Sequence, residues 1–373
     1  MFKGKATQRA AEDYLKRHGV NPAQMREFCG IPVSALALGT YLGGMDEVTD
    51  SKVTQACLLA LELGCNFFDS AINYRAQRAE RSIGEALRRA ILSGKAKREE
   101  IFVSTKGGFV PFESQPVPDV VGLFEDRYVK TGVANRADLI AGCHCMEPAY
   151  IENQIDRSRA NLQLETIDLY YLHNPETQLE ELPERLFYEK LEKAFIALEK
   201  AVQSGRIGAY GMATWSAFRE ELGAQTAVQL ERCVVAAERA AESLGLEKHH
   251  FAAIQTPLNL AMPEAALIRT QRLGQDILPA IDAAHVLGLS VAVSVPLFQA
   301  RLCHGLPDFI VEKFPERFSQ AQCALSFATA FASVDVAMVG MKMAEHVRHN
   351  LEFLRTEGLS EGELKSVIEA MVA

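Results

Sequence analysis

Residues 167–174 read IDLYYLHN, an apolar and aromatic run that ends in a histidine and an asparagine. These residue types favour a strand, and the run has the length of a buried one. A helical stretch follows, in which Leu191, Phe195, Leu198 and Val202 recur at steps of three and four residues and form one apolar stripe. Because such a helix needs a sheet to cover, the two segments predict one strand–helix unit of an α/β protein.

The same unit recurs along the chain. Apolar runs rich in Val, Ile, Phe and Tyr, bounded by Gly, Pro or polar residues, alternate with helical patterns. The predicted strands span residues 34–40, 65–71, 101–107, 167–174, 207–214, 251–258, 289–297 and 334–341. Eight strands that alternate with helices admit a closed barrel or an open doubly wound sheet, and eight is the number that closes. We therefore expect an α/β fold of the (β/α)8 TIM barrel type, with the open sheet as the alternative.

Some segments lie outside these units. Two predicted connections, residues 108–150 and 215–250, are longer than ordinary βα loops, which indicates a function. The first connection would lie at the reaction face of a barrel. The alternative to a functional loop is a partly mobile insertion without a function. The first connection carries large apolar side chains that would roof a pocket, namely Phe109, Phe112, Phe124, Tyr128 and Met146. Residues 1–30 predict a charged helical extension. The barrel domain, with its long βα loops, is expected to span residues 31–373.

The composition excludes some classes of function. The chain has 373 residues, 48% of them hydrophobic, and a net charge of −9 at pH 7. Nucleic acids and anionic membranes require a basic surface, so we expect neither as a partner. The chain has eight cysteines without regular spacing, an N-terminus without an apolar signal core, and apolar runs far shorter than the ~20 residues of a membrane span. These features predict a cytoplasmic protein, and no motif distinguishes a monomer from a homo-oligomer.

Polar residues lie near the ends of several predicted strands. Asp69, Lys106 and His173 come at the carboxyl ends of the second, third and fourth strands, which converge on one face of a barrel. Tyr74 follows Asp69 by five residues and would lean back over them. A tyrosine donates a proton poorly unless an adjacent ammonium lowers its pKa, and Lys106 would supply that charge. Asp69 would hold the lysine, and His173 would polarise a substrate carbonyl by hydrogen bonding.

Each of these residues also has a simpler explanation. Asp69 would cap the turn after its strand, Tyr74 would be a packing residue, Lys106 a solvated charge and His173 a core histidine. The joint arrangement favours the chemical interpretation: a proton donor to a carbonyl that receives hydride, with no covalent nucleophile.

Five segments resemble, in order and spacing, the aldo-keto reductases. They are FDSAINYRAQRAERSIGEAL (68–87), VSTKGG (103–108), DLYYLHNPE (168–176), GRIGAYGMATW (205–215) and VGMKMAEHVRHNLEFL (339–354). The resemblance covers roughly residues 36–354. It implies a (β/α)8 barrel, reversible reduction of an aldehyde or ketone to the alcohol, and a cofactor that is usually NADPH. It also implies that the family's catalytic Asp, Tyr, Lys and His fall on Asp69, Tyr74, Lys106 and His173.

The resemblance further implies contacts to the cofactor. Gly39, Thr40 and Tyr41 match the loop after the first strand that approaches the cofactor, and Asp69 is also expected to contact the cofactor. Gln255 matches the glutamine that binds the nicotinamide amide.

Two cofactor contacts depart from the family pattern. This chain has Thr214 and the alanine before it where the family often has Ser-Asn. If Leu297 aligns with its counterpart, the aromatic residue that stacks on the nicotinamide ring is replaced by Ser294. Trp215 and Tyr210 are the alternatives for that stacking contact.

The motif GMKMAEHVRHN at residues 340–350 bears on the choice between NADP and NAD. Lys342 and His346 lie in the region of the 2′-phosphate, and His346 stands where the family usually has Arg. Asn350 matches the asparagine on the adenine side, and Gly340 and Met341 belong to the same segment. Because a 2′-phosphate favours basic side chains, we expect NADP(H), with NAD(H) as the alternative.

Other interpretations remain open. Cys143, His144 and Cys145 have the residue types of zinc ligands but lack a spaced second Cys/His pair, so we expect no metal and assign them to the approach to the fourth strand. The resemblance also permits a cofactor-binding, redox-sensing subunit of a larger assembly, or a barrel that has lost turnover. The intact group of four residues favours the reductase.

Overall fold

The predicted strands form a closed barrel. The structure, a computed structural model, describes residues 1–372. The barrel strands are β3 (Leu36–Gly39), β4 (Phe67–Asp69), β5 (Phe102–Gly107), β6 (Ile167–His173), β7 (Ile207–Ala213), β8 (Phe251–Pro257), β11 (Ser290–Ser294) and β12 (Val336–Gly340). Within the described residues these eight strands close in the order β11-β12-β3-β4-β5-β6-β7-β8. The (β/α)8 prediction is confirmed and the open-sheet alternative is wrong, because β12 pairs in parallel with β3 and completes the ring.

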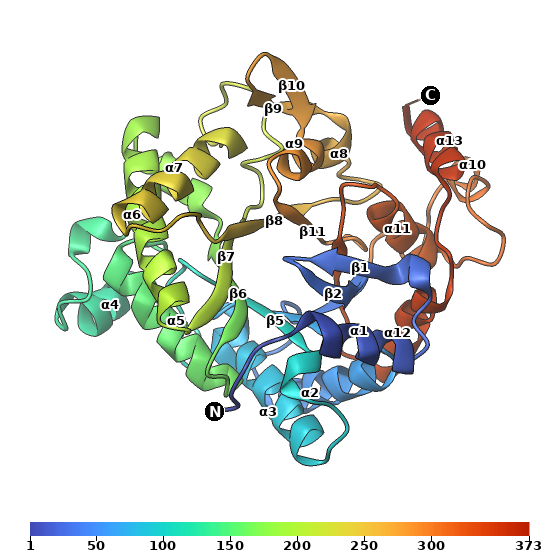
Figure 1. Cartoon of the computed structure of the whole chain (residues 1–373), viewed down its shortest axis with the longest axis horizontal. Helices are drawn as coiled ribbons and strands as arrows, with labels where there is room; N and C mark the ends of the chain where they lie inside the picture. The colour runs from blue at the N-terminus through green and yellow to red at the C-terminus, as the bar shows by residue number, and fades with distance from the viewer. Residues whose placement is uncertain (373) are drawn as a thin grey trace.

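A helix follows each strand and covers the outside of the barrel, as Figure 1 shows. These helices are α2 (Glu47–Glu62), α3 (Arg78–Leu92), α5 (Pro148–Leu162), α6 (Glu184–Gln203), α7 (Leu230–Ser243), α9 (Ala280–Val286), α11 (Gln320–Thr329) and α12 (Ala344–Leu351). In α6 the predicted stripe is buried at Leu191, Phe195 and Leu198. Helix stripes and outward-facing strand residues form one apolar core, and the barrel interior forms a second core around Phe67 and Phe102.

A hairpin closes the amino-terminal end of the barrel. Helix α1 (Gln8–Arg17) precedes the antiparallel strands β1 (Met25–Phe28) and β2 (Ile31–Ser34), which lie across the barrel in Figure 1. Phe28 is fully buried, with its ring centroid 5.2 Å from that of Phe67 and 5.6 Å from that of Phe102. The sequence predicted a helix in the first thirty residues but did not predict this hairpin.

Asp168 ties the segment before α1 to the same end of the barrel. Its Oδ1 accepts a hydrogen bond from the Ala6 backbone N–H at 2.6 Å. Its Oδ2 accepts from Arg98 Nη2 at 2.6 Å and from the Val103 N–H at 2.9 Å. The side chains of Arg98 and Asp168 are each 3% exposed, so this ion pair is shielded from solvent. One carboxylate therefore joins three parts of the chain.

The remaining elements are short additions to the barrel. They are α4 (Val120–Phe124), α8 (Glu264–Leu267), the hairpin of β9 (Arg269–Leu273) and β10 (Asp276–Pro279), α10 (Asp308–Val311) and the final helix α13 (Glu361–Val372). No helix in residues 1–372 combines the length and apolar character needed to cross a membrane.

The predicted apolar roof in residues 108–150 is wrong in part. Phe124 and Tyr128 are buried against Tyr150, with ring centroids 5.8 and 4.7 Å from it, so they form a local core of this segment. Of the five apolar side chains predicted to cover a pocket, Phe109 lies on the wall of the main cavity. A local core was hidden in the sequence because residues that pack inward and residues that face a ligand have the same apolar types.

Candidate active site

A cavity of about 1170 Å³ opens at the carboxyl ends of the barrel strands, and Asp69, Tyr74 and His173 line it. Lys106 lies next to it and is 1% exposed. The ring centroid of Tyr74 lies 5.0 Å from Lys106 Nζ and 5.6 Å from the ring centroid of His173. The four side chains that the sequence analysis singled out therefore form one contiguous group.

Asp69 and Lys106 form a buried ion pair on neighbouring strands, with Lys106 Nζ 2.5 Å from Asp69 Oδ2. Asp69 also accepts from Ser104 Oγ at 2.6 Å, and Lys106 Nζ donates to the Ser70 carbonyl at 2.8 Å. Burial lowers the pKa of Lys106, but the charge of Asp69 and the surrounding hydrogen bonds outweigh burial and raise that pKa overall. Lys106 therefore keeps its charge inside the protein.

The segment after β4 carries Tyr74 over Lys106. The backbone N–H groups of Ser70 and Ile72 donate to the carbonyls of Ser104 and Lys106 at 3.0 and 3.1 Å, so this segment runs alongside β5. Burial raises the pKa of Tyr74 above its ordinary value, and the charge of Lys106 opposes that rise without cancelling it. The predicted lowering by Lys106 is present, but the expectation of a lowered pKa overall is wrong. The phenol holds its proton at neutral pH.

A strained turn follows Tyr74. Arg75, Ala76 and Gln77 have φ values of 49°, 53° and 71°, a left-handed conformation that costs free energy for residues with a Cβ. Arg75 is buried, forms an ion pair with Asp50 and donates from Nε to the Gly44 carbonyl at 2.9 Å. These contacts hold the turn, and with it the tyrosine, against the strain.

His173 is neutral. Burial, followed by the charge of Lys106, lowers the pKa of His173 well below its ordinary value. Within the described residues, its Nδ1 is buried without a hydrogen-bond partner. Phe109 packs edge-on against the ring at a centroid distance of 5.1 Å. A neutral imidazole next to a cavity has one N–H to offer to a bound molecule.

Of the Cys143, His144 and Cys145 cluster, His144 contacts His173. One ring nitrogen, Nε2, is 2.8 Å from the His173 carbonyl oxygen, and the other, Nδ1, is 2.9 Å from Gln178 Nε2. In the described part of the chain, no group of three or more His, Cys, Asp or Glu residues has an arrangement that would hold a metal ion. Both ring nitrogens of His144 are already engaged within the protein.

The residues expected to contact a cofactor all line the same cavity. They are Gly39, Thr40, Tyr41, Asp69, Thr214, Gln255, Ser294, Leu297, Gly340, Met341, Lys342, His346 and Asn350. Among the described residues the hydroxyl of Thr214 is buried without a partner, so it offers a polar group to a bound molecule. The backbone N–H of Thr214 donates to the Gln255 carbonyl at 2.9 Å, which fixes the two residues side by side.

One expectation for the cavity is wrong, and several lining residues were missed. Tyr210 is fully buried on the outside of the barrel and donates to Glu199 Oε1 at 2.9 Å, so it does not offer a stacking surface, whereas Trp215 lies on the cavity wall. Missed lining residues include Asn73, His304 and His349. Asn73 was detectable as the neighbour of Tyr74, and His349 as the residue three positions after His346 on one helix. No motif marked His304.

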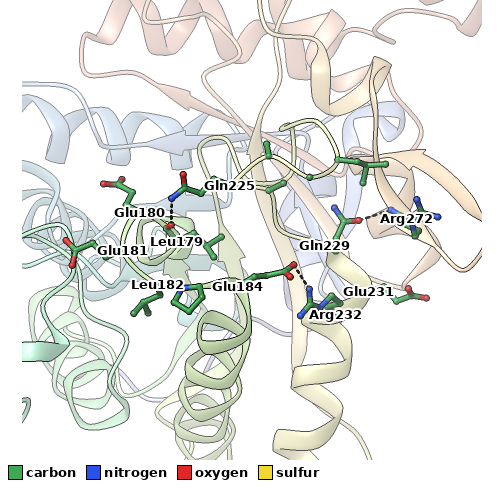
Figure 2. A pocket seen from close by; sticks show the side chains of 15 residues that line it. Leu179, Glu180, Glu181, Leu182, Glu184, Gln225, Gln229, Glu231, Arg232 and Arg272 are labelled. Carbon is green, nitrogen blue, oxygen red and sulfur yellow. Dashed lines mark hydrogen bonds and ion pairs between the residues drawn. The ribbon is translucent and has the colours of Figure 1, made fainter.

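A second hollow, of about 730 Å³, lies between the start of α6 and the loop after β7. Figure 2 shows its lining, where Arg232 is paired with Glu184 and Gln225 Nε2 donates to the Leu179 carbonyl at 3.0 Å. None of its lining residues belongs to the group around Tyr74. The chemical groups are therefore concentrated in the larger cavity.

Comparison with known proteins identifies a family. Residues 35–222 match the Aldo/keto reductase family. The mouse (Mus musculus) aldo-keto reductase family 1 member C13 is 29% identical over 143 residues, which are 38% of this chain and 32% of that protein. The Schizosaccharomyces pombe aldo-keto reductase yakc, whose name includes NADP(+), is 29% identical over 187 residues, 50% of this chain and 44% of that protein. The chain thus spans less than half the length of these curated relatives.

Solved structures extend the likeness of fold to nearly the whole chain. The glycerol dehydrogenase from Gluconobacter oxydans has a TM-score of 0.63 at 19% identity, covering 94% of this chain and 96% of that one. The Klebsiella pneumoniae aldo/keto reductase in complex with NADP and acetate has a TM-score of 0.61 at 20% identity, covering 93% and 94%. Since the family match takes in half of the sequence, including Asp69, Tyr74, Lys106 and His173, this chain belongs to the aldo/keto reductase family.

Proposed function

We propose that this protein reduces an aldehyde or ketone to the alcohol with NADPH, reversibly, and that Tyr74 donates the proton. The observation that carries the proposal is the group beside the cavity, in which the phenol lies next to a buried charged lysine and a neutral histidine. Such a group suits the protonation of a carbonyl oxygen that gains negative charge.

Tyr74 is the proton donor because its phenol is protonated at neutral pH and lines the cavity. As negative charge develops on the carbonyl oxygen, that oxygen takes the phenolic proton. The phenolate left behind then lies beside Lys106, whose charge stabilises it. Asp69 holds the ammonium in place before the reaction, so no reorganisation is needed.

His173 orients the substrate. With Nδ1 buried and unpartnered in the described residues, the tautomer that carries its proton on Nε2 leaves no buried N–H without an acceptor. That N–H would donate to the substrate carbonyl and hold its oxygen near the phenol of Tyr74.

The residues present fit a nicotinamide cofactor. When bound, NADPH supplies a hydride to the carbonyl carbon. Thr214, with its free hydroxyl, and Gln255 would hold the amide of the nicotinamide, and Lys342 and His346 would hold the 2′-phosphate. The names of the S. pombe relative and the K. pneumoniae complex support NADP(H) over NAD(H).

The proposal also covers the compartment, the substrate class and the oligomeric state of the protein. The eight cysteines are free thiols, which supports a reducing compartment such as the cytoplasm. The negative net charge disfavours a nucleic acid as the substrate. We propose that the protein works as a monomer or a homo-oligomer.

The test is NADPH oxidation by the purified protein against a panel of aldehydes, ketones and dicarbonyls. Tyr74→Phe should lower kcat by about 10²-fold or more, while NADPH binding stays within about twofold. Tyr128→Phe is the matched control, because the Tyr128 hydroxyl is buried without a partner in the described residues and its removal breaks no hydrogen bond. Binding of NADPH without turnover of any substrate would favour a redox-sensing subunit instead, and absence of NADPH binding would remove the cofactor assignment.

A further inference from the structure

His144 makes two hydrogen bonds that together fix which ring nitrogen carries its proton. Gln178, in the 3-10 turn Pro175–Glu180, approaches Nδ1 with its amide nitrogen at 2.9 Å, and that nitrogen only donates. The His173 carbonyl oxygen approaches Nε2 at 2.8 Å, and a carbonyl only accepts. His144 is therefore neutral, with its proton on Nε2 directed at the backbone of His173. Burial lowers the pKa of His144 to about 4, in agreement with a neutral ring.

The His173 carbonyl lies where the strand ladder ends. The next N–H along the chain, that of Asn174, donates to the Ala213 carbonyl on β7 at 2.6 Å. Because the peptide is trans, the His173 carbonyl points the opposite way, toward β5. There the N–H of Gly108 is already used by Gln154 Oε1 at 2.7 Å. His144 supplies the donor that the ladder lacks.

The chain around His144 is built to allow this approach. Gly108 has φ +139°, and a Cβ at that position would lie 2.5 Å from His144 Nε2 and 3.1 Å from the His173 oxygen. The Val110 N–H donates to the Cys143 carbonyl at 2.8 Å, which lays the segment of His144 along the residues after β5. Only glycine at position 108 leaves room for the contact.

The ring of Phe109 packs against both imidazole rings. Its centroid lies 5.0 Å from that of His144 and 5.1 Å from that of His173, and both pairs are edge-on at 88°. His144 thus holds His173 in two ways, through the backbone carbonyl and through Phe109, which itself lines the cavity.

We propose that His144 is a positioning residue, which sets the orientation of the His173 ring toward the substrate carbonyl. The inference rests on the proposed reductase function. It assigns a role to the Cys-His-Cys motif that is neither metal binding nor packing alone, with Gln178 as the residue that fixes the proton on Nε2. Because a small misplacement of an orienting group slows a reaction without weakening distant contacts, the effect belongs to kcat and not to cofactor affinity.

Two variants separate positioning from packing. His144→Leu keeps most of the volume and removes the N–H, and His144→Gln restores an N–H of similar reach. We expect the Leu variant to lower kcat about tenfold or more, with the Kd of NADPH within about twofold, and the Gln variant to recover to within about threefold of wild type. His250→Gln is the matched control, because His250 makes a 2.7 Å contact with Glu199 away from the cavity lining.

Imidazole nitrogen NMR gives a readout that needs no turnover. In wild type, His173 should show one neutral tautomer, which the Gln variant keeps and the Leu variant loses or broadens. A Leu variant with wild-type kcat, or equal losses of kcat in the Leu and Gln variants, would overturn the positioning role.

If neither variant folds, Gln178→Met decides: it frees the His144 tautomer, and an unchanged kcat and His173 spectrum would refute the role. Should wild type reduce no carbonyl, the function proposal fails, and the NMR comparison alone decides whether His144 orients His173.

Discussion

Lys106 sets the protonation of two neighbours with one charge. Its ammonium opposes the burial that raises the pKa of Tyr74, and it adds to the burial that lowers the pKa of His173. Asp69 allows that charge to exist at a position that is 1% exposed. At the scale of single residues, the ion pair therefore prepares a phenol that can become a phenolate beside an imidazole that stays neutral.

Lys342 is the residue on which we expect the choice of cofactor to depend. Its side chain is exposed on the cavity wall, and none of the carboxylates in residues 1–372 forms an ion pair with it, whereas His346 lies 3.8 Å from Glu345. Lys342→Ala should weaken NADPH binding about tenfold or more and change NADH binding less than about twofold, because only NADPH carries the 2′-phosphate. Fluorescence titration of Trp215, the single tryptophan, measures both affinities.

The control for this prediction is Arg348→Ala, which removes a positive charge from α12, the helix that follows Lys342, at a position outside the cavity lining. Equal losses of affinity for NADPH and NADH in Lys342→Ala would remove the assignment of the phosphate to this lysine.

The sequence predicts the members of the site better than their physical state. Asp69, Lys106 and His173 were accessible because a polar residue at the end of an apolar strand is conspicuous and parallel strands end on one face. The pKa of Tyr74 was not, because it depends on how deeply the folded chain buries the phenol. Tyr210 was misplaced because β7 is apolar on both faces, so its alternation does not reveal which side chains point outward.

Among the secondary-structure elements, the hairpin of β1 and β2 was not predicted from the sequence pattern. Its strands have four residues each, too few to show an alternating pattern. The turn between them is Cys29 and Gly30, both left-handed with φ 51° and 75°, and a cysteine is an unusual residue at such a position. The eight barrel strands were predictable because each is a run of apolar residues bounded by Gly, Pro or polar residues.

The attachment of the first residues to the barrel should depend on Asp168. In Asp168→Asn the amide nitrogen must face one of the donors that the carboxylate now accepts, and Arg98 loses its counter-charge inside the protein. Breaking a buried pair on one side costs about 3 kcal/mol of unfolding free energy, which chemical denaturation measures.

Asp126→Asn serves as the matched control, because the pair of Asp126 with Lys130 is exposed at 68% and 73%. We expect a change below about 1 kcal/mol there. A loss of that small size in Asp168→Asn would show that the contacts around Ala6 contribute little to the fold.

At the scale of the whole molecule, two buried neutral histidines make stability depend on pH. The unfolded chain takes up a proton on His144 near pH 6.5, whereas the folded chain does so only near pH 4. Protonation therefore favours unfolding across this window, and the stability from His144 is complete above pH 6.5 and lost as the pH falls toward 4. His173 acts in the same direction. Asp335 acts in the opposite direction, because burial raises its pKa from 3.8 to about 6.

A difference measurement isolates His144 from these opposing groups. The free energy of unfolding of wild type minus that of His144→Gln should be smaller by about 2 kcal/mol at pH 5 than at pH 7. Chemical denaturation of both proteins at the two pH values measures it. The same difference at both pH values would mean that the buried ring titrates normally.

Residues that stabilise the barrel and residues that line the cavity lie at opposite ends of the barrel, which matters for laboratory evolution. Phe28 and Asp168 close the amino-terminal end of the barrel, and neither residue lines the cavity at the carboxyl end. A saturation library at Leu42 and Trp215 therefore samples new substrate preferences on a scaffold whose closure does not depend on them. Most members of such a library should remain folded, so that screening reports selectivity and not loss of protein.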